Sequence, residues 1–134
     1  MKTDETNPLD WFLLGAERLR AADAVRQTCG AGGSAVELLQ ESVERYLKGF
    51  LIGRGWPLQK IHNLSTLLDA AIQRDPRFQS FADLCESLTA QFWQQHYPGG
   101  DLTEVGADYD ALRQQAEALV ALILSAPPPP PATS

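Results

Sequence analysis

Apolar residues recur at intervals of three and four along most of this chain, and Pro or Gly interrupts the repeat at several points. Because residues three or four apart share one face of a helix, the spacing predicts about five amphipathic helices. No segment alternates apolar and polar residues for the length of a strand, so we expect no sheet. Helices joined by short links favour an all-α fold, an antiparallel up-and-down bundle.

Capping residues and helix breakers place the boundaries. Asn7-Pro8 and Asp75-Pro76 each combine a side chain that caps exposed amides with a proline that fits the first turn. Ser34 lies three residues before Glu37, the spacing of a capping box, and Gly53 is a helix stop. We therefore expect helices over residues 8 to about 28, 34–52, about 60–72 and 76–96, and a fifth that begins between 103 and 108.

The length of the chain fits one domain, because 134 residues bury one hydrophobic core but not two. The helical bundle is expected over residues 7–126, after a flexible N-terminus of residues 1–6. The five consecutive prolines from Pro127 to Pro131 cannot join a helix. Residues 127–134 are therefore expected to form a disordered, Pro-rich tail.

Charge and composition exclude several classes of protein. The net charge of −6 argues against DNA binding through general attraction to phosphates. The longest apolar window, residues 118–126, is far shorter than the ~20 residues that a membrane-spanning helix needs. No secretory signal precedes the two isolated cysteines, so we expect a soluble, cytoplasmic protein with reduced thiols.

The basic residues of the middle of the chain form one concentrated positive stretch, made of Arg45, Lys48, Arg54 and Lys60. Such a patch usually covers a solvated helix face. Its alternative role is to anchor a phosphate or an acidic partner. Glu44 lies four residues before Lys48 and is expected to form an exposed ion pair with it.

The sequence lacks the usual signatures of a catalytic or metal site. His62 stands at a predicted helix start, where a histidine is more often a hydrogen-bonding residue than a base. Two histidines and unpaired cysteines, without HxxxH or HExxH spacing, do not make a zinc site, and no serine or cysteine has a visible base partner. We expect no metal and no cofactor. Trp56 lies in a predicted turn and is the tryptophan expected to be exposed to a partner.

Several motifs, taken in order, resemble those of the HEPN family of helical domains (higher eukaryotes and prokaryotes nucleotide-binding). They are the Glu44-x-x-x-Lys48 step, His62-x-Leu64 at the opening of the next helix, and His96-Tyr97-Pro98 at the end of the fourth. The resemblance covers about residues 9–124. It departs at His96, where the family commonly has an arginine and this chain has an imidazole.

The resemblance implies a bundle that usually forms a homodimer and is often encoded beside a minimal nucleotidyltransferase, as a two-component toxin–antitoxin pair. Active members are metal-independent ribonucleases with an Arg-x(4–6)-His motif. Seven residues separate Arg54 from His62, and no arginine precedes His96 at the motif's spacing. We therefore expect a non-catalytic subunit that binds a nucleotide, RNA or a partner, with a cleft lined by Lys48, His62, His96 and Tyr97.

Two alternatives stay open at this point. A degenerate RNA-cleaving toxin would use Arg54 and His62 across a dimer seam, with the cation stabilising the phosphorane while the histidine moves a proton. An acidic helical adaptor would instead bind a partner protein through the bundle surface and the Pro-rich tail.

Overall fold

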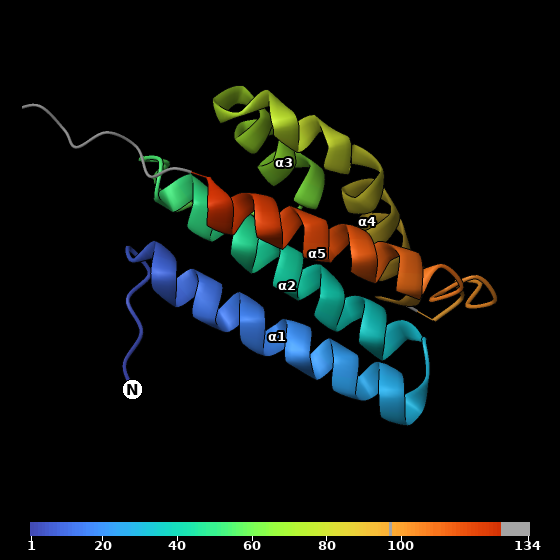
Figure 1. The fold of residues 1–134 in the computed structure, drawn as a ribbon. Helices are drawn as coiled ribbons and strands as arrows, with labels where there is room; N and C mark the ends of the chain where they lie inside the picture. Colours follow the sequence, from blue (N-terminus) through green and yellow to red (C-terminus); the bar gives the residue numbers. More distant parts are fainter. Residues whose placement is uncertain (97, 127–134) are drawn as a thin grey trace, which may run out of the picture.

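The computed structural model describes residues 1–96 and 98–126. Five α-helices follow one another, a 3-10 helix (η1) precedes the fourth, and the described residues contain no strand (Figure 1). The predicted all-α bundle is confirmed. None of the described helices is long and apolar enough to cross a membrane. The elements are α1 (Pro8–Cys29), α2 (Gly33–Ile52), α3 (Leu64–Arg74), η1 (Pro76–Phe81), α4 (Ala82–His96) and α5 (Tyr109–Ser125).

Capping side chains set two helix starts as predicted. The side chain of Asn7 accepts a hydrogen bond from the Leu9 amide at 3.0 Å. The side chain of Asp75 accepts one from the Arg77 amide, also at 3.0 Å. This second cap opens η1 rather than an α-helix, and α4 follows directly. Gly53 ends α2 as expected.

Two other predicted starts are wrong by one residue. α2 begins at Gly33, because the Gly32 carbonyl already accepts the first helical hydrogen bond. Ser34 therefore lies inside the helix and forms no capping box. α5 begins at Tyr109, just past the predicted range. The side chain of Asp108 accepts a hydrogen bond from α4 and does not cap α5.

α3 also begins later than predicted, at Leu64 instead of near residue 60. The side chain of Asn63 accepts a hydrogen bond from the Thr66 amide at 3.1 Å, which caps the helix at that point. Residues 56–63 therefore form an irregular segment between α2 and α3. This segment carries His62 to the side of α2, where it contacts a glutamate of that helix.

The N-terminal segment, residues 1–6, contacts the start of α1 through hydrogen bonds. The Asp4 amide donates to the Asp10 side chain, and the Trp11 indole donates to the Glu5 carbonyl, both at 2.8 Å. The predicted Pro-rich tail, residues 127–134, lies outside the described residues.

α2 is the central helix of the bundle, because it packs against the four other α-helices (Figure 1). Among the described elements, α1 packs against α2 alone. Two forked ion pairs reach past this contact and join α1 to α5. Arg26 of α1 pairs with Asp110 at 3.1 Å, and Arg113 of α5 pairs with Asp23 at 2.8 Å.

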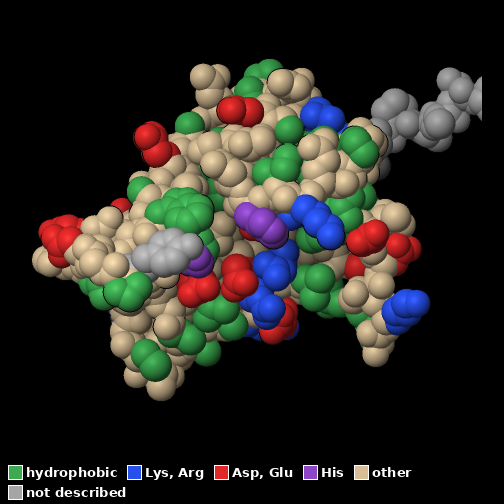
Figure 2. Space-filling model, turned by 180° about the vertical axis from the view of Figure 1, so that it is seen from behind, with side chains coloured by type: hydrophobic (Ala, Val, Ile, Leu, Met, Phe, Trp, Pro, Cys, Tyr) green, Lys and Arg blue, Asp and Glu red, His purple; other side chains and the backbone are tan. Residues whose placement is uncertain are grey.

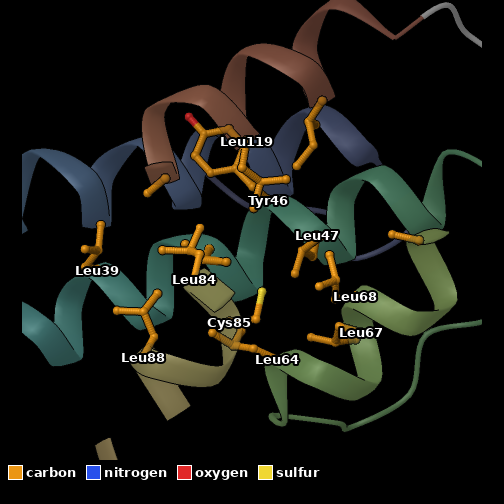
Figure 3. Packing of buried hydrophobic residues seen from close by; sticks show 14 of the residues in the cluster. Leu39, Tyr46, Leu47, Leu64, Leu67, Leu68, Leu84, Cys85, Leu88 and Leu119 are labelled. Carbon is orange, nitrogen blue, oxygen red and sulfur yellow. The ribbon is translucent and has the colours of Figure 1, made fainter. Parts of the chain in front are cut away.

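The hydrophobic core lies between α2 and the helices that follow it, where leucines of several helices point toward one another (Figure 3). Cys85 is buried among them, and burial raises the pKa of its thiol to about 12. The thiol is therefore protonated and inert at neutral pH. The labelled leucines, each at most 2% exposed, are Leu39, Leu47, Leu64, Leu67, Leu68, Leu84, Leu88 and Leu119.

Two glycines allow α1 to lie close to α2. A Cβ atom on Gly15 would come within 2.7 Å of the Tyr46 ring, and one on Gly49 would come within 2.5 Å of the Phe12 ring. Each helix thus contributes one glycine and one aromatic ring to the contact, and the two rings stack at 5.8 Å. The close approach of the two helices therefore depends on glycine, which has no side chain, at positions 15 and 49.

Gly49→Leu is expected to lower the free energy of unfolding by about 1–3 kcal/mol, because the new side chain must displace the Phe12 ring from a close contact. Leucine has the higher helix propensity, so the loss must come from overpacking. Urea unfolding followed by circular dichroism measures the change. The control is Gln27→Ala at an exposed position of α1, which should change stability by less than ~0.5 kcal/mol. Unchanged stability of Gly49→Leu would contradict the close contact.

Candidate functional site

A groove of about 290 Å³ runs along one side of α2, bordered by the second half of α4 and by the segment before α3. Figure 2 shows a face of the molecule where histidine, basic and acidic side chains gather beside hydrophobic ones. The groove combines these same kinds of side chain. Its lining includes Glu37, Glu44, Arg45, His62, Phe92 and Trp93.

The aromatic side chains of the groove belong to α4 and lie beside the start of α2. The Gln95 side chain, near the end of α4, donates a hydrogen bond to the Gly33 carbonyl at 2.9 Å. The last turn of α4 is therefore held against the first turn of α2. Trp93 lies in that last turn of α4 and lines the groove with Glu37 of α2.

The basic side chains of the groove lie at its other end. His62 contacts Glu44, which is about two helical turns beyond Glu37 along α2. Arg45 is the next residue of α2 and also lines the groove. The groove is therefore polarised along α2, with aromatic rings near one end and basic groups near the other.

Glu44 forms a buried ion pair with Lys48, whose Nζ lies 3.1 Å from Glu44 Oε2. The predicted exposed pair is wrong, because Glu44 is 8% exposed and Lys48 only 4%. α2 is covered from several sides, and the Trp11 ring of α1 lies 5.7 Å from the Lys48 ammonium. Each partner of such a pair depends on the other, since an unpaired charge is costly in a low dielectric.

His62 also contacts Glu44, with Nδ1 3.1 Å from the same oxygen, Oε2. The imidazole remains 78% exposed. When Nδ1 donates to the carboxylate, Nε2 is left available to accept a hydrogen bond from a ligand. In the two described ranges, no group of three or more His, Cys, Asp or Glu side chains is arranged to hold a metal ion.

The four residues of the predicted basic patch lie in different surroundings. Arg45 lines the groove, whereas Lys48 is buried. Arg54 packs on a phenylalanine ring of α2 at 4.8 Å and lines a separate pocket between α1 and the end of α5. Lys60 is exposed in the segment before α3. The structure therefore places Arg54 and His62 in different pockets, and it is Arg45 that shares the groove with His62.

His96 belongs to an aromatic cluster at the end of α4. Its ring stacks on Phe92 at 5.0 Å and meets Trp93 edge-on at 5.3 Å, measured between ring centroids. It thus contacts both aromatic residues that line the groove. Tyr97, which was predicted to bind a ligand with His96, lies outside the described residues.

Trp93, rather than Trp56, is the exposed tryptophan. Trp56 is only 8% exposed, because the turn after α2 folds back and its amide donates to the Leu51 carbonyl at 3.0 Å. Its predicted exposure is wrong. Trp93 is 58% exposed at the groove. The sequence signal that could have indicated this aromatic site is the Phe92-Trp93 pair just before His96.

Gln91 occupies a position that the Arg-x(4–6)-His motif gives to arginine, with four residues between it and His96. Its amide is engaged at both ends, since Oε1 accepts from the Gly106 amide and Nε2 donates to Asp108, each at 2.9 Å. The side chain therefore holds the loop before α5. It supplies no positive charge for phosphate chemistry.

Lys48→Met is expected to lower the free energy of unfolding by about 3–5 kcal/mol, because it leaves the Glu44 carboxylate buried without its cation. His62→Ala should lose less than ~1 kcal/mol, since its side chain is exposed. Urea unfolding compares the two variants. Adding Glu44→Leu to Lys48→Met should restore most of the lost stability, because no buried charge remains. A negligible effect of Lys48→Met alone would show that Glu44 does not depend on Lys48 for its burial.

Comparison with known proteins agrees with the motif resemblance. A family model described as HEPN domain matches residues 10–124, which extend from α1 to α5 and include every residue that lines the groove. No curated protein matches the chain, and no solved structure does. The family match covers most of the chain, and the protein therefore belongs to the HEPN family.

Proposed function

We propose that this protein is a non-catalytic HEPN subunit that binds a nucleotide in the groove along α2. The observation that carries the proposal is the polarity of the groove, with aromatic rings near one end and basic groups near the other. Glu37 and Arg45 are eight residues apart, which separates their backbone positions by about 12 Å along the helix. A nucleotide has the same polarity, base to phosphate, over a comparable length.

The base would stack on Trp93. This indole is 58% exposed, and Phe92 meets it edge-on with the ring centroids 5.5 Å apart. Such an arrangement is favourable between aromatic rings and holds the indole in place. Stacking of a base on an exposed aromatic side chain contributes roughly 1–3 kcal/mol and tolerates any of the bases.

The phosphate would bind Arg45. Its guanidinium donates to the Glu41 carbonyl at 3.2 Å, and no ion pair joins it to a carboxylate of the described residues. Two of the groove's carboxylates already have cations: Glu41 has Arg18 at 3.6 Å, and Glu44 has Lys48. The charge of Arg45 therefore remains available, and a guanidinium suits the two-point recognition of a phosphate.

Size and chemistry both favour binding over cleavage. A groove of about 290 Å³ lies at the lower limit of the ~300–1,000 Å³ typical of ligand pockets, which fits a mononucleotide better than a length of RNA. Gln91 stands where the ribonuclease motif has arginine, and Arg54 lines another pocket than His62. Neither Gln91 nor Arg54 therefore supplies the cation that the motif pairs with a histidine in the described part of the chain.

We further propose that the protein forms a homodimer and pairs with a nucleotidyltransferase in a toxin–antitoxin-like system. Membership of the family suggests these partners. Exposed leucines offer a contact surface: Leu9 and Leu13 of α1 are 70% and 47% exposed, and Leu124 of α5 is 58% exposed. Leu9 and Leu124 line the same pocket, so the surface is shared by both helices.

Nucleoside 5′-monophosphates are expected to raise the melting temperature once their concentration exceeds the dissociation constant. Trp93→Ala and Arg45→Ala should each weaken binding about tenfold or more, because each removes one end of the site. Thermal denaturation over a nucleotide concentration series measures both effects. The matched control is Arg74→Ala, an exposed cation of α3 that is not part of the groove. A melting temperature that no mononucleotide changes would contradict the proposal.

RNA incubated with the purified protein in the presence of a chelator is expected to stay intact, because Gln91 replaces the arginine of the ribonuclease motif. Gel electrophoresis of total RNA over a time course checks this result. Metal-independent cleavage that disappears in His62→Ala or Arg45→Ala would show that the site is catalytic.

A further inference from the structure

We propose that the groove selects guanine over the other bases, and that the carboxylate of Glu37 makes the selection. This inference rests on the proposed nucleotide site and names the class of nucleotide that the site takes. Glu37 lies on α2 and lines the groove with Trp93, at the end where the base would stack.

The carboxylate of Glu37 has no competing partner within the described ranges. It forms no ion pair and accepts no hydrogen bond there. Glu41 and Glu44 line the same groove but have cations within 4 Å. Of these three carboxylates, Glu37 is therefore the one free to bind a ligand.

A carboxylate only accepts hydrogen bonds, and it has two oxygens that accept from two parallel donors. Guanine presents such a pair on its Watson–Crick edge, the N1–H and the 2-amino group. Adenine presents one amino group beside N1, an acceptor that a carboxylate oxygen repels. Uracil has a single N–H between two carbonyls, and cytosine has an amino group beside an acceptor. Guanine alone satisfies both oxygens of the carboxylate.

The other end of the groove favours a nucleotide over a second kind of ligand with two parallel donors. An arginine side chain of a peptide would also pair with a carboxylate and stack on an indole. Arg45 lies at the opposite end, about 12 Å from Glu37 along the helix, where it repels a second cation and attracts an anion. A ligand that carries guanine at one end and phosphate at the other matches both.

Isothermal titration calorimetry with GMP, IMP and AMP tests the inference. IMP keeps the N1–H of guanine but lacks the 2-amino group, so affinity should fall in the order GMP, IMP, AMP. GMP should bind about 10–100-fold more tightly than AMP, the discrimination expected of one good two-point contact. Arginine amide serves as the probe for a peptide cation and should not bind at these concentrations.

Glu37→Gln should reduce the affinity for GMP, because the amide offers only one acceptor. It should raise the affinity for AMP, because the amide's acceptor and donor match the amino group and N1 of adenine, so the preference for GMP should disappear. Its matched control is Glu86→Gln, an exposed glutamate of α4 outside the groove, which should keep the preference. Circular dichroism confirms that both variants are folded.

Three results would overturn the inference, and they differ in what they mean for the nucleotide site. Equal binding of GMP and AMP, lost in Trp93→Ala, would disprove guanine selection but support the site. A preference for GMP that persists in Glu37→Gln would disprove the role of Glu37. Binding of arginine amide without binding of any mononucleotide, or no binding at all, would disprove both the inference and the proposed function.

Discussion

The buried ion pair of Glu44 and Lys48 connects α2, which forms one side of the groove, to α1 and to the segment before α3. Lys48 lies against the Trp11 ring of α1, and Glu44 contacts His62 in the segment before α3. Removing two charges from water is costly, and their attraction offsets that cost only while both remain in place. The pair therefore contacts both α1 and the segment of residues 56–63 from its place on α2.

Paired charges reconcile the acidic composition of the protein with the phosphate site proposed at Arg45. The net charge of −6 governs long-range attraction, whereas a bound phosphate responds to the groups within a few ångströms. Lys48 and Arg18 lie beside Glu44 and Glu41, so these carboxylates repel an anion less than their number suggests. Arg45 then adds an unpaired cation at one end. The local balance of charge, rather than the total, decides which ligand fits.

Features that depend on nearby residues could be predicted from the sequence, and features that depend on distant ones could not. Asn7 and Asp75 cap helices within two residues of themselves, so their patterns are sufficient. Burial of Lys48 depends on α1 and on the irregular segment that covers α2. The helical periodicity of α2 does not indicate how many other elements pack against each of its faces. The exposure of Trp56 was predicted wrongly for the same reason, because the turn after α2 folds back and covers this side chain.

Gln91 of α4 stands at the position of the ribonuclease motif's arginine and also holds the loop before α5. Its Oε1 accepts a hydrogen bond from the Gly106 amide, and a guanidinium has no acceptor to offer in its place. An arginine there could still donate to Asp108 but would leave the amide of the buried Gly106 without its partner. The loop before α5 therefore depends on the side-chain amide of Gln91, the residue that stands in place of the motif's arginine. The arginine of the ribonuclease motif and this contact to the loop therefore cannot both be present at position 91.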